Sequence, residues 1–379
     1  MSELNETSAR AAIESVLDPI YERSLGELGL VREVQVQSDP SGQGALVRAT
    51  LTVHALSEEK HQELTSRVEA ALTKLGAARM DIELAFEAPM RRTNADDPVP
   101  AVRNVILVMS GKGGVGKSTC ATNLALALNR MGARVGLLDA DIYGPSIPTM
   151  LGVSGHPHST DGKQIQPMGR FGLKLMSIGF LIESDKDAII WRGPMLQGAL
   201  NQFLADVAWG ELDYLVLDLP PGTGDVALSL MQRLKTTGAV VVTTPQEVAL
   251  QDVYKSVSMC KKLNVQVLGV VENMSYFVDP SGQQHRIFGE GGGQKIADFA
   301  EAPLLAQIPI DQTVREWGDK GTPVVQGAPD SPIANAFMKL AESLVEVVTA
   351  RADELGGGGA PVIDRSGGTG GRRRLPVTK

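Results

Sequence analysis

Apolar and polar residues follow two different patterns along this chain of 379 residues. In residues 1–90 the apolar residues recur with the period of a strand in VREVQVQ, ALVRATLTVHA and MDIELAF, and with helical spacing in SEEKHQELTSRVEAALTKLG. A period of two is typical of a strand with one buried face, and a period near 3.6 of an amphipathic helix. Residues 1–90 are therefore predicted to form a small α/β domain, and the polar, proline-bearing stretch 91–103 a linker.

From residue 104 to residue 355 short runs of consecutive apolar residues alternate with helical stretches. The runs are VILVM, VGLLD, YLVLDLP, AVVVTTP, VQVLGVV and LLAQIPI. Strands without polar alternation are buried on both faces, as in a parallel sheet covered by helices. The alternation predicts an α/β domain with a doubly wound and mostly parallel sheet.

The last stretch of the sequence, residues 356–379, is rich in glycine and carries Arg372, Arg373 and Arg374. Such a composition cannot bury enough apolar surface to offset the entropy of ordering, so this stretch is predicted to be a disordered tail. The three arginines could contact an acidic partner, but a solvated tail is the favoured interpretation.

Charge and cysteine content narrow the possible functions. The formal net charge is -8, which does not favour nucleic-acid binding through the phosphate backbone. The sequence shows neither a signal-peptide pattern nor an apolar run long enough to span a bilayer, so we expect a cytoplasmic protein without a membrane anchor. The two cysteines, Cys120 and Cys260, lie in apolar helical stretches and are predicted to be buried free thiols.

Residues 111–118 read GKGGVGKS and fit the phosphate-binding pattern G-x-x-x-x-G-K-[ST] between a predicted strand and a predicted helix. Glycines allow backbone N–H groups to turn toward phosphate oxygens, and the start of the helix adds partial positive charge. Lys117 is expected to reach the β- and γ-phosphates of ATP, and the Ser118 hydroxyl to bind Mg²⁺. The predicted loop contacts are Gly111, Lys112, Gly113, Gly114, Val115, Gly116, Lys117, Ser118 and Thr119.

Three acidic residues follow the ends of buried strands. Asp139 and Asp141 end one apolar run, and Asp218 ends another. In an open α/β sheet functional groups gather at the carboxyl ends of the strands, so we expect Asp218 to bind Mg²⁺ directly or through water and Asp139 to help hold the metal shell. Asp141 is expected to orient or deprotonate the attacking water. Capping of a turn or helix is the alternative for Asp139 and Asp141.

Several motifs carry a resemblance to known families. SGKGGVGKST, with its early lysine, resembles the deviant Walker A loop of the MinD/ParA class of P-loop ATPases. DADIYGPSIP, SIGFL, WRGPM, DLPPGTGD, TTPQEVAL, GVVENMSYFV and IFGEGGG, in this order, resemble the Mrp/ApbC family of ATP-binding iron–sulfur cluster carriers. Residues 1–90 resemble, through DPIYERSLGELGLV, the small iron–sulfur-assembly domain often fused ahead of these ATPases. The resemblance implies a slow ATPase that acts as a homodimer, with iron–sulfur assembly proteins or client apoproteins as partners.

The same resemblance implies roles for individual residues. Lys112 would cross the homodimer interface to the phosphates of the nucleotide in the other subunit, where its charge would make hydrolysis depend on dimerisation. A solvated loop lysine is the alternative. Asn273 would recognise adenine, because its amide offers both a donor and an acceptor, and Pro309 and Ile310 would line the base pocket.

The sequence departs from the family at the cluster ligands. Cluster-binding members carry a Cys-x-x-Cys pair just after the asparagine that corresponds to Asn273, so two subunits supply four thiolates to one cluster. Here Asp279 and Gly282 stand at the corresponding places. Glycine has no ligating side chain and a carboxylate is a poor substitute for soft thiolate, so the usual iron–sulfur site is predicted to be missing.

Three histidines are the other metal candidates: His156 and His158 in HPH, and His285 in QQHRIF. Exposed loop histidines are the favoured interpretation over a paired-histidine metal site. Two functions remain open from the sequence. One is an ATP-hydrolysing protein of the iron–sulfur carrier family, and the other is a MinD/ParA-like regulatory ATPase whose nucleotide-driven dimerisation controls partner binding without a cluster.

Overall fold

The computed structural model describes residues 4–38, 45–54, 58–159, 162, 164–181 and 193–351, without the side chains of residues 193, 194, 196 and 197. The chain divides into two compact units, one up to Pro89 together with the end of the last helix from Val345, the other from Met90 to Leu344. The predicted disordered tail with Arg372, Arg373 and Arg374, and the first two residues of the WRGPM motif, lie outside the described residues.

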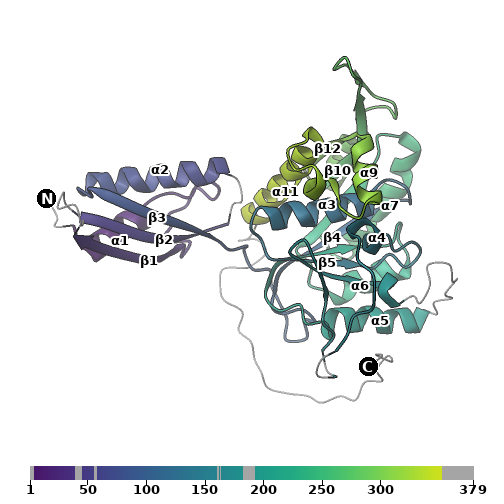
Figure 1. Ribbon diagram of the computed structural model, residues 1–379, viewed down its shortest axis with the longest axis horizontal. Coiled ribbons are helices and arrows are strands. Elements are labelled where there is room, and N and C mark those ends of the chain that lie inside the picture. The colour runs from purple at the N-terminus through teal and green to yellow at the C-terminus, as the bar shows by residue number, and fades with distance from the viewer. Residues whose placement is uncertain are drawn as a thin grey trace. The chain divides into compact units, whose positions relative to one another are not determined.

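The first unit is a small sheet with two helices on one face. Its elements are α1 (Glu6–Glu14), β1 (Val31–Ser38), β2 (Ala45–Val53), α2 (Glu58–Lys74) and β3 (Arg79–Phe86). The sheet order is β1-β2-β3, with β1 antiparallel and β3 parallel to β2 (Figure 1). Ile13 of α1 and Val68 of α2 pack against Val47 and Leu51 of β2, and all four are buried. The three strands and the long helix predicted for this region are confirmed.

The second unit is built on one large sheet. Its strands are β4 (Val102–Ser110), β5 (Val135–Asp139), β6 (Met168–Arg170), β7 (Leu173–Ser177), β8 (Leu212–Asp218), β9 (Gly238–Thr243), β10 (Val267–Val278), β11 (Gln284–His285) and β12 (Leu304–Ile310). Its helices are α3 (Lys117–Arg130), α4 (Ile147–Leu151), α5 (Gly193–Ala205), α6 (Asp225–Arg233), α7 (Glu247–Lys262), α8 (Gly292–Ala300), α9 (Gln312–Asp319), α10 (Val324–Gly327) and α11 (Pro332–Ala350), with a 3₁₀ turn at Ile178–Leu181.

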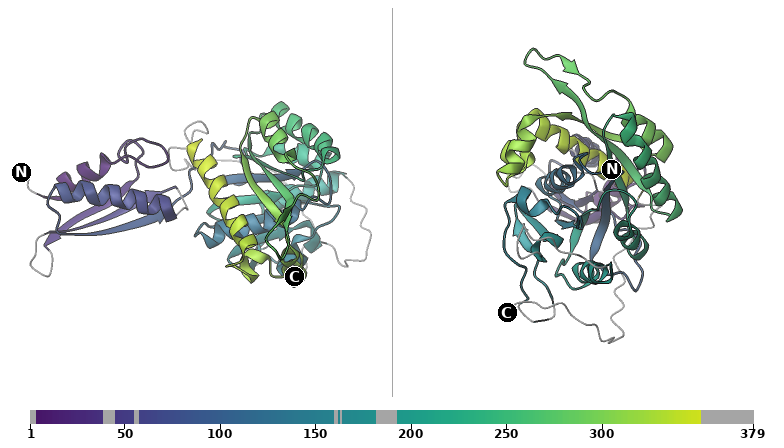
Figure 2. Two further views of the ribbon diagram at one scale, coloured as in Figure 1. Left: turned by 90° about the horizontal axis from the view of Figure 1, so that it is seen from above. Right: turned by 90° about the vertical axis from the view of Figure 1, so that its right-hand side faces the viewer.

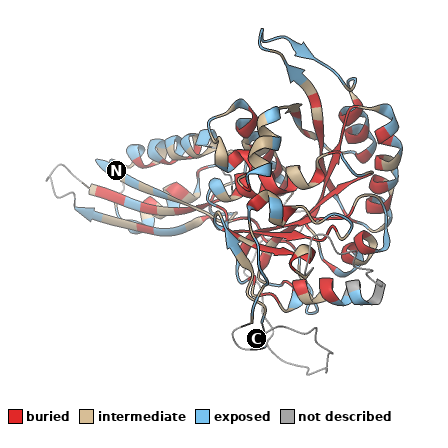
Figure 3. Cartoon of the chain, turned by 45° about the vertical axis from the view of Figure 1, so that its right-hand side comes forward, coloured by how far each residue is buried: buried red, intermediate tan, exposed pale blue. Residues whose placement is uncertain are grey.

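Among the described residues the strand order is β11-β10-β9-β4-β8-β5-β7-β6, with β12 pairing with β10. The strands from β9 to β7 pair in parallel, and antiparallel pairing occurs at β6 and β11. Figure 3 shows that the central strands are buried along most of their length, because helices cover both faces. The predicted doubly wound, mostly parallel sheet is confirmed. β4 lies between β8 and β9, at the point where successive connections run to opposite sides, which is where open α/β sheets bind ligands.

Two strands of the structure were not fully predicted by the apolar runs of the sequence. β7 pairs with β5 although its run, LKLMS, is short and contains a lysine. β10 continues past the predicted run 265–271 to Val278, where it pairs with β11. The end of β10 and β11 form an arm that projects from the body of this unit (Figure 2).

Within the described part of the chain, no helix combines the length and the apolar character needed to cross a membrane.

The proline-bearing stretch after Met90 is anchored to the second unit. The guanidinium of Arg91 forms a buried ion pair with Asp97. It also donates hydrogen bonds to the carbonyl oxygens of Lys235 at 2.7 Å and Val99 at 2.8 Å. Since a buried charge is costly without partners, these contacts fix the path of the chain into β4. The linker assignment of residues 91–103 stays a prediction.

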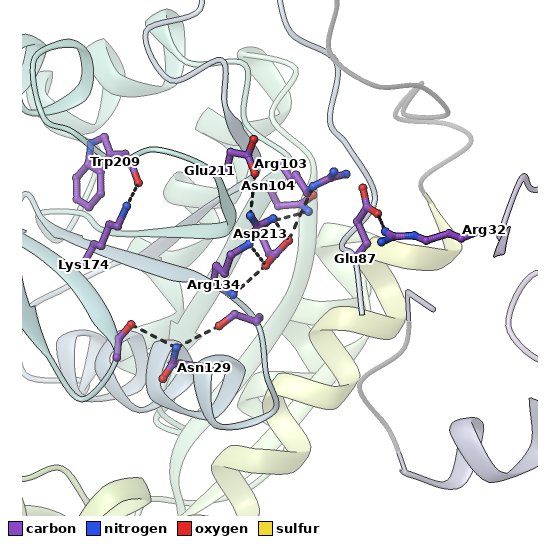
Figure 4. A network of polar contacts seen from close by, with 12 residues as sticks. Arg32, Glu87, Arg103, Asn104, Asn129, Arg134, Lys174, Trp209, Glu211 and Asp213 are labelled. Atoms are coloured by element: carbon purple, nitrogen blue, oxygen red, sulfur yellow. Dashed lines mark hydrogen bonds and ion pairs between the residues drawn. The ribbon is translucent and has the colours of Figure 1, made fainter. Parts of the chain in front are cut away.

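A polar network ties together the amino ends of β4, β5 and β8, and Figure 4 shows its side chains around Asp213. The carboxylate of Asp213 is 3% exposed and accepts hydrogen bonds from the backbone N–H of Arg134 at 2.9 Å and from its Nε at 3.1 Å. These hydrogen bonds raise the pKa of the Arg134 guanidinium. The Asn104 amide donates to the backbone carbonyl of Asp213, so β4, β5 and β8 are joined at one point.

Replacing Asp213 with alanine is expected to lower the free energy of unfolding by about 2 kcal/mol, because the backbone N–H and guanidinium of Arg134 lose a buried acceptor. Urea unfolding followed by circular dichroism measures this change. The matched control is Glu211→Ala, since Glu211 also pairs with Arg134 but its side chain is 81% exposed; its expected cost is about 0.5 kcal/mol or less. Equal costs for the two substitutions would contradict the structural role of Asp213.

Candidate functional site

The predicted phosphate-binding loop lies between the end of β4 and the start of α3. Gly114 and Gly116 have φ angles of 82° and 83°, in the left-handed region that side-chain-bearing residues rarely adopt. A Cβ atom on Gly111 would lie 2.4 Å from the backbone nitrogen of Val253, and one on Gly116 would lie 2.1 Å from Nδ2 of Asn273. The glycines are therefore required by both backbone conformation and close packing, and the loop opens directly into the positive end of α3.

Lys117 is the hub of the site. Its side chain is 6% exposed, and its Nζ lies 2.5 Å from Oδ1 of Asp218 and 3.3 Å from Oδ2 of Asp141. It also lies 3.3 Å from the hydroxyl of Ser118. The structure thus brings together the lysine, the hydroxyl and two of the three acids that the sequence selected. An ammonium, a hydroxyl and carboxylates at the start of a helix can hold a phosphate chain with its metal ion.

One oxygen of the Asp218 carboxylate has no hydrogen-bond partner among the described residues. This oxygen is Oδ2, and the residue is fully buried at the end of β8. Burial raises the pKa of the Asp218 carboxyl, and the Lys117 ammonium and the Ser118 hydroxyl act in the opposite direction. A buried, unsatisfied carboxylate oxygen beside a hydroxyl is the kind of oxygen donor set that Mg²⁺ prefers, so these residues fit that ion.

Asp139 and Asp141 differ in what they contact. Asp139 is fully buried and accepts hydrogen bonds from the backbone N–H groups of Asp141 at 3.1 Å and Ile147 at 3.3 Å, and from the Ser177 hydroxyl at 3.0 Å. Burial, followed by the nearby charge of Asp218, raises the pKa of Asp139 to about 8. These are the contacts of a capping residue, the alternative interpretation, and the metal role of Asp139 stays a prediction.

The contacts of Asp141 fit both the catalytic interpretation and the capping interpretation. Its Oδ1 accepts a hydrogen bond from the backbone N–H of Tyr143 at 3.2 Å, as a turn-capping residue does. Its Oδ2 faces Lys117, and the residue is 8% exposed. The carboxylate is therefore oriented by the turn and presented to the phosphate site, where a group that positions water has to lie.

The remaining loop residues lie where the motif predicts. Lys112 is half-buried, and its backbone carbonyl accepts a hydrogen bond from the Ser110 hydroxyl at 3.1 Å. Among the described residues, the Lys112 ammonium forms no ion pair or hydrogen bond. Val115 is buried, and Thr119 is half-buried in the first turn of α3.

Asn273 contacts the phosphate-binding loop directly. Its Nδ2 donates a hydrogen bond of 2.8 Å to the backbone carbonyl of Val115, and the residue is 7% exposed. The pairing of β10 with β12 is irregular after Asn273, and Met274 has a φ of 55°, so the strand is locally distorted as in a bulge that redirects a side chain. Pro309 and Ile310 lie at the end of the adjacent β12. Adenine recognition by these residues stays a prediction.

The positions expected to carry cluster ligands form a closed turn at the tip of the arm. Oδ1 of Asp279 accepts hydrogen bonds from the backbone N–H groups of Ser281 at 2.8 Å and Gln283 at 3.0 Å, and from the Ser281 hydroxyl at 2.6 Å. Its Oδ2 lies 2.8 Å from Nε2 of His285. The Ser281 hydroxyl and His285 hold the pKa of Asp279 well below its usual range. Gly282 has a φ of 87°, so both residues act as turn formers.

The thiols and the other histidines form no alternative metal site. Cys120 and Cys260 are buried and unpaired, as predicted, and burial raises the pKa of each thiol to about 12, which suppresses the thiolate form that binds metals. His156 and His158 are exposed, as predicted, and Nδ1 of His156 lies 2.7 Å from the carbonyl oxygen of Phe180. Among the described residues, no three or more His, Cys, Asp or Glu side chains are arranged to hold a metal ion.

Sequence reasoning missed one buried charged residue beside this site. Glu272 is fully buried in β10, next to Asn273, and contacts both α8 and β12. A single acidic residue inside the apolar run GVVENMS is the signal that could have identified it, because charged residues are rarely fully buried unless they are paired.

Comparisons of sequence and structure relate this chain to P-loop NTPases and to iron–sulfur cluster carrier proteins. Residues 101–345 match a sequence model of the ParA family, described as NUBPL iron-transfer P-loop NTPases. An iron–sulfur cluster carrier protein from Aquifex aeolicus is 54% identical over 260 residues, 67% of this chain and 71% of that protein. One from Synechocystis is 42% identical over 357 residues, 92% of this chain and 99% of that protein. The structure of a nucleotide-binding protein from Archaeoglobus fulgidus in complex with ADP superimposes with a TM-score of 0.53 at 41% identity, covering 61% of this chain and 92% of that one.

Proposed function

The chain belongs to the ParA family of NUBPL-type iron-transfer P-loop NTPases, and on that premise we propose that it binds and hydrolyses ATP and serves in the assembly or delivery of iron–sulfur clusters. The binding and hydrolysis of ATP are supported chiefly by one observation, the convergence of Lys117, Asp218 and Asp141 behind a glycine-rich loop. The full-length match to an iron–sulfur cluster carrier protein supports the second half.

ATP would bind with its phosphates against the loop and the start of α3. Lys117 would exchange its contact with Asp218 for the β- and γ-phosphates, which need a fixed cation. The Ser118 hydroxyl and the free oxygen of Asp218 would hold Mg²⁺, which neutralises phosphate charge when bound. The close approach of Asn273 to Gly116 and Val115 supports a base site on this side of the loop.

Hydrolysis would depend on Asp141. The turn that includes Tyr143 fixes this carboxylate, and one of its oxygens faces the phosphate site. A carboxylate so placed can accept a hydrogen bond from the attacking water and orient it toward the γ-phosphate. Once Lys117 has moved to the phosphates, Asp141 loses its ion-pair partner and becomes available to the water.

Lys112 would act on the nucleotide of a second copy of the chain. Its ammonium has no partner among the described residues, and this supports the role, because a cation that arrives from another subunit can stabilise transition-state charge only after dimerisation. The protein would therefore be a homodimer when ATP is bound, and hydrolysis would report that the dimer has formed.

Mixing two inactive variants tests this part of the proposal. Lys112→Ala removes the cation that acts in trans, and Asp141→Ala removes the group that orients water. In a mixed dimer, one site retains its own Asp141 and receives Lys112 from the partner, so ATPase activity should return to at most about one half of the wild-type rate per dimer. Phosphate release is measured for each variant alone and for the mixture.

The formation of mixed dimers is verified by affinity capture with a tag on one variant only. If the mixture stays as inactive as its components while mixed dimers are captured, Lys112 does not act across the interface. A Lys112→Ala protein that is fully active by itself would lead to the same conclusion.

The cluster half of the proposal differs from the usual carrier site. The turn at Asp279 and Gly282 offers no thiolate, and the carboxylate of Asp279 is occupied by hydrogen bonds within the turn. The cluster, as cargo, would be held with cysteines that a partner supplies, and the chain would bind an assembly partner or client in a nucleotide-dependent way. Exposure of Phe277, Val278 and Ile287 on the arm supports contact with a partner protein there.

A further inference from the structure

A buried glutamate joins three elements immediately beside the nucleotide site. Oε1 of Glu272 in β10 accepts hydrogen bonds from the Ser275 hydroxyl at 2.5 Å and from Nε2 of Gln307 in β12 at 2.8 Å. Oε2 accepts one of 2.6 Å from the backbone N–H of Gly293 at the start of α8. The residue is fully buried, so the side chain is held by these contacts rather than by solvent. A carboxylate at the positive end of a helix is also favourable electrostatically.

Two glycines at the start of α8 allow this contact because they have no side chains. A Cβ atom on Gly293 would lie 2.6 Å from Cβ of Glu272, and one on Gly292 would lie 2.5 Å from the carbonyl oxygen of Pro245. The start of α8 can therefore approach β10 and the loop after β9 only because both positions lack side chains. Three motifs of the sequence, TTPQEVAL, GVVENMSYFV and IFGEGGG, thus meet in one packed cluster.

The residue that follows Glu272 is the one that contacts the phosphate-binding loop. Asn273 donates to the carbonyl oxygen of Val115, and its amide fills the space above Gly116. Directly after Asn273 the strand is distorted, and Met274 adopts a left-handed backbone conformation. A strand distorted on one side of Asn273 has to be fixed on the other side if the amide is to keep its place.

We infer that Glu272 is a positioning residue for nucleotide binding: by joining β10 to α8 and β12, it holds Asn273 against the phosphate-binding loop. This inference rests on the proposed function in taking ATP as the nucleotide and Asn273 as the contact for its base. Glu272 itself would touch neither the base nor the phosphates.

The test uses full-length protein and compares Glu272→Met, which keeps the volume but cannot accept hydrogen bonds, with Glu272→Gln. In Glu272→Gln, the amide oxygen still accepts from Gly293 and the amide nitrogen donates to Gln307 after that side chain flips. We expect Glu272→Met to raise the Kd for ATP about tenfold and Glu272→Gln to change it less than about threefold. The turnover rate at saturating ATP should change less than about twofold in both, because only uniform binding is lost.

A double-mutant cycle with Asn273→Ala separates positioning from general stability. If Glu272 acts through Asn273, each single substitution raises the Kd for ATP about tenfold and the double variant also raises it about tenfold. A roughly hundredfold rise in the double variant means that the two residues act independently, which overturns the inference. Glu272→Ala serves in the same cycle if the methionine variant fails to fold. Glu301→Gln is the matched control, because Glu301 is an exposed glutamate just after α8 and should leave the Kd unchanged.

Amide hydrogen exchange of the nucleotide-free protein tests the positioning role of Glu272 separately from ATP binding. Glu272→Met and Asn273→Ala should both speed exchange in residues 113–118 by a similar factor, about tenfold, and the double variant should add nothing. If Asn273→Ala leaves ATP affinity unchanged while exchange follows this pattern, base recognition by Asn273 fails and the positioning role of Glu272 stands. Unchanged exchange in Glu272→Met overturns the positioning role.

Discussion

Replacing Lys117 with alanine is expected to weaken ATP binding by at least about 100-fold, or about 3 kcal/mol. The β- and γ-phosphates lose the cation that the fold places at the start of α3, and the lysine ammonium no longer offsets the charges of Asp218 and Asp141. Isothermal titration calorimetry with MgATP measures the affinity.

The Lys117→Ala variant should nevertheless fold at neutral pH. Burial raises the pKa of the Asp218 carboxyl, so without Lys117 this group can take up a proton instead of remaining as an unpaired buried charge. Circular dichroism checks the fold. Lys255→Ala is the matched control, because Lys255 is an exposed lysine on α7 that pairs with Asp252 in the same helix. Tight ATP binding by a folded Lys117→Ala protein would show that the nucleotide lies elsewhere.

Replacing Asp141 with alanine is expected to reduce ATP hydrolysis by about 100-fold or more while MgATP still binds. Orientation or deprotonation of the attacking water by a positioned carboxylate contributes about 10²- to 10⁴-fold to the rate. The phosphates keep Lys117, and Asp218 keeps its free oxygen for the metal ion, so binding should change less than about fivefold. Phosphate release under single-turnover conditions, together with calorimetry, separates the two effects.

Asp319→Ala is the control for the Asp141 variant, because Asp319 is an exposed aspartate of α9 that pairs with Arg315. It should hydrolyse ATP at the wild-type rate. Normal turnover by Asp141→Ala would remove Asp141 from the catalytic role and leave it as the turn-capping residue that its contact with Tyr143 also allows.

The nucleotide site could be predicted from the sequence because its parts are local or lie at fixed places in the fold. The glycine-rich loop carries its own conformation, and acids at the carboxyl ends of neighbouring parallel strands must come close to it. Asp218 and Asp141 lie within reach of Lys117 for this reason. The order of apolar runs was enough to predict the sheet, since buried parallel strands need nearly continuous apolar residues.

Other features depend on contacts between distant segments that periodicity does not reveal. Asp139 also follows a strand end, but its carboxyl accepts from Ser177 and from the start of α4, so its surroundings rather than its position distinguish it from Asp141. The contact of Asn273 with Val115 spans 158 positions of sequence. The arm was missed because its residues are exposed, so no pattern of buried positions marks it, and its turn is stabilised by a side chain.

The phosphate-binding loop and the tip of the arm differ in the ligands that they offer. The proposed phosphate site brings Lys117 together with Asp141 and Asp218, whereas the tip of the arm is a turn closed by the Asp279 carboxylate. Oδ1 of Asp279 accepts hydrogen bonds from the backbone N–H groups of Ser281 and Gln283, and Oδ2 lies 2.8 Å from Nε2 of His285. A carrier built in this way would couple ATP hydrolysis to a partner that brings its own thiolates.

The central claim is that this chain by itself offers no conventional cluster site, and cluster loading tests it most directly. The native protein and the double variant Asp279→Cys, Gly282→Cys are reconstituted without air, and iron, sulfide and visible absorption are measured per polypeptide chain. The account predicts little stable [4Fe–4S] cluster in the native protein and clearly more in the double variant, with ATP binding intact in both. Equal cluster content in the native protein and the double variant would contradict it, and the chain would then hold clusters through ligands other than residues 279 and 282.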